Sequence, residues 1–408
     1  MGAVPVTDGI WWVGGVDWNL RDFHGYETPR GTTYNAYLVK GDDGFALIDT
    51  VKTPFVRELL DRVSTIVAPA DVGTIVVNHI EPDHNSGLPD VMAAMPDARV
   101  IASKSGAAGV AAYHDGLQIG VVGADEVVDL GGRTLHFMPA PMVHWPDSMF
   151  TWCPEVATLM PNDAFGQHVA STVRFADELG LEESLTELGV YWANILQPLA
   201  PTVARTVAKI AERGWEPEII APSHGVIWRG SEAIGAAMDR YDRWENRQTC
   251  PKAIIAYSTM WGSTDAMARA IADGVSEGGA VCKLYDLAVT PLAHITWQLL
   301  ESKALLLGSP TLHHTMLYRV AGYLAYLEGL KPTGKSAGVF GSFGWGGGSV
   351  KAMAARLDEI GFDLPFEPLA IKFRPDEEER EACRAWGREV AASVLAAGCE
   401  LPVDGSVG

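Results

Sequence analysis

Four side chains that commonly bind metals lie close together in the segment His79-Ile80-Glu81-Pro82-Asp83-His84. The segment follows the apolar run Thr74-Ile75-Val76-Val77, which predicts a short buried strand. Loops at the carboxyl ends of strands carry the chemistry of many α/β folds. Two imidazoles and two carboxylates form a mixed nitrogen and oxygen donor set, which suits iron, manganese or zinc better than copper or an iron–sulfur cluster. The segment therefore predicts a centre of one or two metals.

Three more candidate ligands each follow a predicted short strand. A histidine at a strand end is, taken alone, more often a surface or core residue than a ligand. Together with the first segment, however, the three residues form a set that favours a metal site over that interpretation. They are His144 after the strand predicted at 134–138, Asp163 after 156–160, and His224 after 218–221.

The second half of the chain contains a loop that suits a phosphate group. A strand predicted at 253–257 is followed by Ser258-Thr259-Met260-Trp261-Gly262-Ser263-Thr264, and a helix is predicted from about Asp265. The N-terminus of a helix favours a doubly charged anion through its free N–H groups and its dipole. Clusters of Ser and Thr also cap helices, so this loop alone leaves both interpretations open.

The first loop resembles the flavodoxin phosphate loop, T-x-x-G-x-T, and two further loops, after strands predicted at 304–308 and 337–340, stand where flavodoxin-like proteins hold the flavin ring. Their glycines let the backbone approach a flat ring, and Trp345 offers a stacking face. The chain has no G-x-G-x-x-G motif, which argues against a dinucleotide. We therefore predict that FMN is bound by Thr259, Met260, Trp261, Gly262, Ser263, Thr264, Ser309, Pro310, Thr311, Leu312, His313, Ser342, Phe343, Gly344, Trp345, Gly346 and Gly347.

The length of 408 residues exceeds what one hydrophobic core usually holds, so two domains are expected. We place them at 1–248 and 250–408, because a charged helix end gives way to an apolar strand near Thr249. Strands alternate with helical segments in the second domain, which predicts a doubly wound parallel sheet of the flavodoxin type. The order of elements in the first domain suits an αββα sandwich. The fold class is α/β.

Charge and hydropathy exclude several classes of partner. The net charge of −20 argues against nucleic acid or an anionic membrane surface. No apolar run reaches the roughly 18 residues of a membrane span, and no secretory signal is present, so we expect a cytoplasmic protein. The five cysteines form no C-x-x-C pair, which excludes a zinc ribbon or a rubredoxin-like centre within the chain.

The pattern H-x-[E/H]-x-D-H, followed by a single His, Asp and His, resembles the metallo-β-lactamase superfamily. Its hydrolases have histidine where this chain has Glu81. A carboxylate at that position hardens the site and favours iron over zinc, and this departure resembles the flavodiiron proteins. The resemblance implies that His79, Glu81 and His144 hold one iron, that Asp83, His84 and His224 hold the other, and that Asp163 bridges them.

The resemblance also covers segments outside the ligand set. The N-terminal stretch is similar to the one that covers the diiron pocket in the family, which makes His24 and Tyr26 candidates for a proton-donor or pocket-lining role. Asp49 is expected to support the ligands. The chain departs from the family at Trp192, where a second tyrosine is common, and at His313 and His314, where asparagine is common. Four other histidines match no ligand position, and we expect them to have packing or surface roles: His114, His136, His168 and His294.

A flavin and a diiron pair can together collect the four electrons that reduce O2 to water, whereas reducing two NO to N2O needs two electrons. The resemblance implies one or both activities. It also implies a head-to-tail homodimer, or a dimer of dimers, in which FMN of one subunit faces the diiron site of the other, and an external donor such as rubredoxin. The alternative is a zinc-dependent hydrolase of the metallo-β-lactamase type with an accessory flavodoxin domain, which would leave the FMN loops unused.

Overall fold

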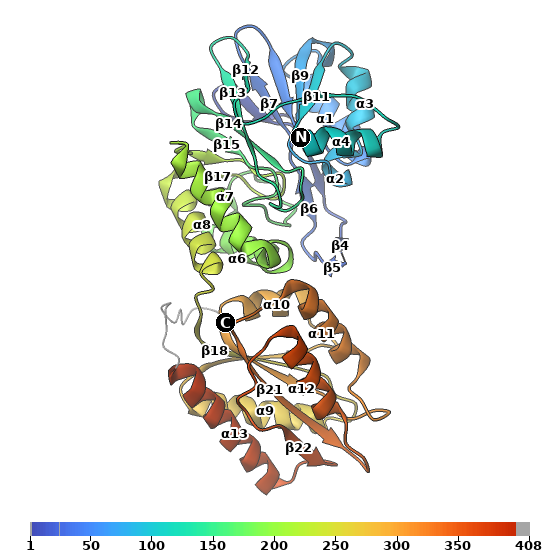
Figure 1. Ribbon diagram of the computed structural model, residues 1–408, viewed down its shortest axis with the longest axis vertical. Helices are drawn as coiled ribbons and strands as arrows, with labels where there is room; N and C mark the ends of the chain where they lie inside the picture. The colour runs from blue at the N-terminus through green and yellow to red at the C-terminus, as the bar shows by residue number, and fades with distance from the viewer. Residues whose placement is uncertain (1, 24, 397–408) are drawn as a thin grey trace. The chain divides into compact units, whose positions relative to one another are not determined.

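The computed structural model describes residues 2–23 and 25–396, which form two compact units (Figure 1). The first unit contains the described chain as far as Asp242, apart from the segment Trp192–Pro198. The second unit contains that segment and the described chain from Arg243 onward. The domain limits predicted above, 1–248 and 250–408, remain a proposal.

The first unit is built on two sheets, in the strand orders β1-β2-β7-β8-β9-β10-β11 and β12-β13-β14-β15-β16-β17. Two small hairpins pair β3 with β6 and β4 with β5. The strands are β1 Val4–Thr7, β2 Ile10–Trp12, β3 Gly15–Asp17, β4 Asp22–Phe23, β5 Tyr26–Glu27, β6 Thr32–Tyr34, β7 Tyr37–Lys40, β8 Phe45–Ile48, β9 Val72–Val77, β10 Arg99–Ala102, β11 Gly120–Val121, β12 Val127–Asp129, β13 Thr134–Pro139, β14 Met149–Cys153, β15 Thr158–Met160, β16 Ile219–Ile220 and β17 Trp228–Arg229.

Strand β9 shows how apolar side chains divide the core into two layers. Its successive side chains point to opposite faces, so Val76 packs with Phe137 and Met160 between the sheets, while Ile75 packs outward with Leu59 of α1. Burial on both faces explains the unbroken apolar run before His79. The helices of this unit are α1 Val56–Val63, α2 Pro82–Asn85, α3 Leu88–Ala94, α4 Lys104–Tyr113, α5 Ala176–Leu179, α6 Leu181–Tyr191, α7 Ala200–Glu212 and α8 Gly230–Glu245, of which the last ends in the second unit.

The second unit is a parallel sheet in the order β19-β18-β20-β21-β22, which is the doubly wound arrangement predicted from the sequence. One core cluster lies on each face of the sheet: Ile255 packs with α9 and α13, and Ile254 with α10, α11 and α12. The elements are β18 Cys250–Tyr257, α9 Ser263–Glu277, β19 Val281–Asp286, α10 Leu292–Leu300, β20 Ser302–Gly308, α11 Tyr318–Leu330, β21 Ser336–Phe343, α12 Ser349–Ile360, β22 Leu369–Lys372 and α13 Glu377–Ala396.

A lysine is buried beside the amino ends of β20 and β21. Lys335 is 6% exposed, and its Nζ donates hydrogen bonds to the carbonyl oxygens of Leu300 at 2.9 Å and Ser302 at 2.8 Å. Leu300 ends α10, so the amine lies at the negative end of that helix dipole. Burial nevertheless lowers the pKa of Lys335 to about 7, because the charged form loses its hydration.

We expect the free energy of unfolding of the wild type to rise between pH 7 and pH 9 relative to that of the variant Lys335→Met. The pKa of the lysine falls from about 10.4 in the unfolded chain to about 7 in the folded protein. Between these values the unfolded chain binds the proton and the folded chain does not, so stability rises with pH by on the order of 1 kcal/mol per unit. Urea unfolding of both proteins at the two pH values measures this, and a pH-independent difference would contradict it.

Candidate functional site

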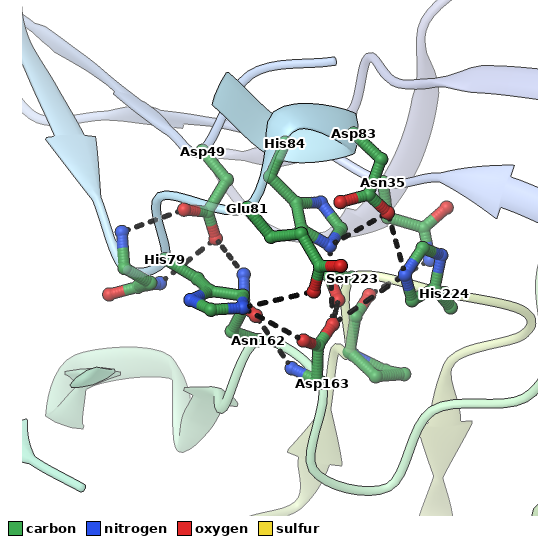
Figure 2. Close-up of polar contacts among 12 residues, drawn as sticks. Asn35, Asp49, His79, Glu81, Asp83, His84, Asn162, Asp163, Ser223 and His224 are labelled. Atoms are coloured by element: carbon green, nitrogen blue, oxygen red, sulfur yellow. Dashed lines mark hydrogen bonds and ion pairs between the residues drawn. The ribbon is translucent and has the colours of Figure 1, made fainter. Parts of the chain in front are cut away.

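The seven ligand candidates converge beyond the carboxyl ends of the strands that precede them (Figure 2). They form two sets, and within each set the potential ligand atoms lie within 4.8 Å of one another. All are buried except His144, which is partly buried. The first set is His79, Glu81, His144 and Asp163, and the second is Asp83, His84 and His224.

Asp163 offers one carboxylate oxygen to each set. Its Oδ2 lies 3.0 Å from His144 Nε2 and 3.5 Å from His79 Nε2. Its Oδ1 lies 3.2 Å from His84 Nε2 and 3.6 Å from His224 Nε2. Figure 2 shows this carboxylate between His79 and His224. A carboxylate in this position is able to bridge two metal ions.

The start of α2 explains why Glu81 belongs to the first set. Pro82 occupies the first turn of the helix and holds the residue before it in an extended conformation, with ψ of 140° at Glu81. The Glu81 side chain therefore leaves the helix and turns toward the first set. Its Oε2 lies 3.3 Å from Nε2 of both His79 and His144.

Asp83 and His84 lie within α2 and face the second set. Asp83 Oδ2 lies 3.4 Å from His84 Nε2 and 3.2 Å from His224 Nε2. Asp83 is 5% exposed, and neither of its carboxylate oxygens accepts a well-formed hydrogen bond from the described residues. A buried carboxylate without donors is costly, and a bound cation would remove that cost. The donor set and its unsatisfied oxygens therefore fit a metal ion.

Hydrogen bonds fix the orientation of two of the imidazoles. His79 Nδ1 donates to Asp147 Oδ2 at 2.9 Å, and the same oxygen accepts from the backbone N–H of Ile80 at 2.8 Å. His224 Nδ1 donates to the carbonyl oxygen of Thr33 at 2.6 Å. With Nδ1 protonated, each ring turns the lone pair of its Nε2 toward the ligand set, which is the tautomer that binds a metal through Nε2.

Asp49 joins the loops that follow β8, β9 and β15. Its carboxylate accepts from the backbone N–H of Asn78 at 2.7 Å and from the side-chain amides of Asn78 and Asn162 at 3.1 and 3.2 Å. Asp49 and Asn162 both have left-handed backbones, with φ of 59° and 52°, which Asp and Asn tolerate better than most residues. Asn162 Oδ1 in turn accepts from the Asp163 N–H at 2.9 Å, so Asp49 supports the shared carboxylate.

Opposite charges compensate one another within the buried cluster. Burial opposes ionisation of Asp163, but the charge of His84 and hydrogen bonds from His144 and His84 outweigh it and hold the pKa of that carboxyl well below its usual range. Burial likewise lowers the pKa of His84 and His144, while the neighbouring carboxylates raise both pKa values to about 9. Binding a metal ion therefore requires the imidazoles to release protons.

The second unit contains a cavity of about 710 Å³ at the carboxyl ends of β18, β20, β21 and β22. Most of the predicted FMN contacts line it. Aromatic faces lie open at its rim, where Trp261 is 92% exposed and Trp345 is 95% exposed. Gly344 and Gly346 line the cavity, and a Cβ atom added to either would meet no protein atom closer than 3.8 Å, so a ligand has room beside both backbones. The lining residues are Met260, Trp261, Ser263, Pro310, Thr311, Leu312, His313, His314, Ser342, Phe343, Gly344, Trp345, Gly346, Phe373 and Arg374.

Comparisons with known proteins agree with both sites. Residues 32–225 match the family "ODP family beta lactamase", and residues 255–387 match the flavodoxin family. The chain is 42% identical over 396 residues to a nitric oxide reductase of Moorella thermoacetica, covering 96% of this chain and 98% of the relative. The crystal structure of the flavodiiron protein from Giardia intestinalis superposes with a TM-score of 0.92 at 33% identity, covering 97% of both chains. The chain belongs to the flavodiiron proteins.

A second solved structure of a relative also supports the assignment of this chain to the flavodiiron proteins. The rubredoxin oxygen:oxidoreductase of Desulfovibrio gigas is 36% identical, with a TM-score of 0.92, over 97% of this chain and 99% of the relative. The predicted α/β fold, with a metallo-β-lactamase-like unit and a flavodoxin-like unit, is thereby confirmed. No helix in residues 2–23 or 25–396 is long and apolar enough to cross a membrane.

His168, for which we expect a packing or surface role, packs beside the candidate metal ligands. Its ring centroid is 4.7 Å from that of His224 and 4.9 Å from that of Tyr191. Its Nδ1 is 2.8 Å from Thr32 Oγ1. The sequence offered one usable signal, since His168 follows Asp163 closely in the same loop.

The two proposed pocket residues of the N-terminal stretch have different outcomes. Tyr26 is 3% exposed, and its ring lies 5.9 Å from that of His168, whose ring is 4.7 Å from that of His224, so Tyr26 lies near the candidate metal ligands. His24 lies outside the described residues, and its role remains a prediction.

The structure also adds residues to the flavin cavity that the sequence had not assigned to it. His314, Phe373 and Arg374 line the cavity, the last two because they directly follow β22. A strand end beside the two flavin loops was the signal that could have identified Phe373 and Arg374, whereas His314 already belongs to one of these loops. Of the predicted contacts, Thr259, Gly262, Thr264, Ser309 and Gly347 do not line the cavity itself.

Two of these five residues shape the phosphate loop. Thr259 Oγ1 accepts a hydrogen bond from the Gly262 N–H at 3.1 Å. Gly262 precedes α9 with φ of 84°, a conformation that favours glycine, and thereby presents the free N–H groups of the first turn of the helix. The cavity, its glycines and this helix N-terminus fit FMN.

We expect the substitution Asp147→Ala to weaken iron binding by about 10- to 100-fold, the usual cost of losing a carboxylate that orients a metal-bound histidine. The reason is that Asp147 fixes the tautomer of His79 through the 2.9 Å hydrogen bond. Iron retained after a timed challenge with a chelator measures the effect. Asp97→Ala, which removes an exposed carboxylate, is the control. Equal iron retention in both variants would contradict the prediction.

Proposed function

We propose that this flavodiiron protein reduces O2 to water, NO to N2O, or both, at a non-haem diiron site, with electrons passed through FMN from an external donor. The observation that carries the proposal is the Asp163 carboxylate, whose two oxygens face separate ligand sets. His79, Glu81 and His144 would hold one iron, and Asp83, His84 and His224 the other. His84 is included because its Nε2 points into the cluster.

Two bound iron ions would supply positions for the substrate and two of the electrons. Reduction of O2 consumes four electrons and four protons for two waters, and reduction of two NO consumes two of each for N2O and one water. Tyr191 is 2% exposed, and burial raises the pKa of its hydroxyl well above the usual value, so the hydroxyl keeps its proton. We propose that Tyr191, Tyr26 and His168 line the proton-delivery side of the site.

The partners of the protein are part of the same proposal. A small redox protein such as rubredoxin would deliver the electrons. A head-to-tail homodimer, or a dimer of dimers, would bring FMN of one subunit to the metal site of another. The side chains of Trp261 and Trp345 are exposed at the cavity rim, which supports the proposal that another protein surface covers them. A cytoplasmic location also remains a prediction. Sedimentation velocity tests the dimer, since a fully active monomer would refute it.

A zinc-dependent hydrolase is the weaker alternative. It leaves the flavin cavity without a role, and the nitric oxide and oxygen reductases among the relatives favour reduction. Metal and flavin analysis separates the two, because the reductase needs iron with FMN and the hydrolase needs zinc alone.

The direct test is steady-state consumption of O2 and of NO, each followed with an electrode, by iron-loaded protein that receives electrons from reduced rubredoxin. Fast O2 consumption without peroxide, or fast NO consumption that yields N2O, would support the proposal and show which gas is preferred. Absence of both reactions in protein that contains iron and FMN and whose flavin rubredoxin reduces would overturn it.

A further inference from the structure

The loop after β20 closes in a tight turn, Leu312-His313-His314-Thr315. The backbone N–H of Leu312 donates to the Thr315 carbonyl oxygen at 2.9 Å, and the N–H of Thr315 donates to that of Leu312 at 3.0 Å. The two central residues have φ of 49° and 64°. Positive φ at both central positions is the mark of a type I′ turn, which strongly prefers Asn-Gly, Asp-Gly or Gly-Gly.

Two adjacent histidines are therefore an unfavourable choice for the turn itself. Left-handed backbone costs a side-chain-bearing residue free energy that glycine does not lose, and such strain persists mainly where function uses it. The position of the turn indicates what that function is. Both histidines line the flavin cavity, and the His314 ring lies beside the glycine loop after β21, where a Cβ added to Gly346 would lie 3.9 Å from its Nδ1.

The cavity differs in charge from the rest of the protein. The chain has 51 acidic and 31 basic residues, yet no carboxylate is among the described residues that line the cavity. Besides the two histidines, Arg374 after β22 is the only ionisable side chain among the described lining residues, and the loops after β18 and β21 contribute none. Asp265, in the first turn of α9, is paired with Arg269 at 2.9 Å. No carboxylate on the described walls balances a positive charge on these side chains. A bound anion would balance it.

We propose that the His313–His314 turn is a proton site coupled to reduction of the flavin, an inference that rests on FMN binding in the proposed function. Reduction by the one-electron donor follows FMN + 2e⁻ + H⁺ → FMNH⁻. As this negative charge appears, an imidazole of the turn takes up one proton from water and becomes a cation. The flavin proton and part of a second proton are then bound for each electron pair, and the reduced form is stabilised by about tenfold, the scale of one charge pair in a partly exposed cavity. Tenfold corresponds to about 30 mV for a two-electron couple.

Potentiometric titration of the holoprotein, followed by flavin absorbance at pH 6, 7 and 8, tests the coupling. One proton for two electrons gives a fall of about 30 mV per pH unit and two protons give about 59 mV, so partial uptake of a second proton gives the wild type an intermediate slope. We expect the intermediate slope in the wild type and about 30 mV per pH unit in the variant His313→Asn/His314→Asn, because asparagine tolerates the turn but does not titrate. His294→Asn, which removes a histidine packed on Tyr285 and Trp297, should keep the wild-type slope.

A fixed charge separates proton uptake from other effects of the substitution. His314→Lys in the His313→Asn background keeps a cation at every pH, and Lys331 shows that lysine adopts φ of 49° in this chain. We expect a slope of about 30 mV per pH unit, with a potential at pH 8 about 30 mV above that of the double asparagine variant.

Equal slopes in the wild type and the double asparagine variant would overturn the inference while leaving the proposed function intact. FMN content, read from the absorption spectrum before each titration, keeps the two apart. A wild type that takes up no FMN would overturn the proposed function, and this inference with it. Should the double variant alone lose FMN, the two single asparagine variants provide the same comparison.

Discussion

Replacing Asp163 with asparagine should lower donor-driven turnover by more than the roughly 100-fold that removal of a supporting residue costs. Asp163 is the one member of the cluster that faces both sets, with Oδ2 3.0 Å from His144 Nε2 and Oδ1 3.2 Å from His84 Nε2. Asparagine keeps the shape of the side chain but offers a single neutral oxygen, and its NH2 group cannot bind a metal. One of the two irons, or both, should therefore be lost.

Iron and FMN analysis of the purified Asp163→Asn variant measures the loss, with O2 and NO electrodes for turnover. FMN content should stay at the wild-type level, because the flavin cavity belongs to the other unit. Asp90→Asn, an exposed substitution in the neighbouring helix α3, is the matched control. An Asp163→Asn protein with two irons and wild-type turnover would show that this carboxylate does not bridge.

The parts of the fold that are periodic along the chain could be predicted from it. The apolar run before His79 is β9, and the strands predicted at 253–257, 304–308 and 337–340 are β18, β20 and β21 of the expected parallel sheet. Burial on both faces leaves such strands with continuous apolar sequence, which is a strong signal. By contrast, β3 to β6 are hairpin strands of two or three residues, too short for any period to be visible.

The fully buried β14, Met149–Cys153, was not predicted although its five residues are mostly apolar. Its pairing with β13 and β15 comes from contacts distant in the chain.

The candidate site also has residues that a local pattern predicts and residues that it does not. The seven ligand candidates stand directly after strands, whereas His168 reaches the site through an irregular loop that no local pattern specifies. Arg374 follows β22 and lines the flavin cavity, but no motif around it predicts that position.

Replacing Glu81 with histidine should exchange iron for zinc and lower gas reduction by more than about 100-fold. Glu81 Oε2 lies 3.3 Å from Nε2 of both His79 and His144, so the variant would present three imidazoles with the Asp163 carboxylate. Three nitrogens and one oxygen suit tetrahedral zinc, and the loss of a negative charge weakens binding of a harder, more highly charged iron. Zinc has no redox chemistry, so a zinc-loaded set cannot contribute electrons.

Metal analysis of Glu81→His protein produced with both metals in the medium gives the ratio of zinc to iron, and gas electrodes give the turnover. Two controls separate the causes. Glu81→Asp keeps the carboxylate but shortens its reach, so it should retain iron over zinc with weaker binding. Glu182→His adds a histidine at an exposed position of α6 and should change neither quantity. Retained iron with full turnover in Glu81→His would refute the prediction, because the choice of metal would then reside outside this carboxylate.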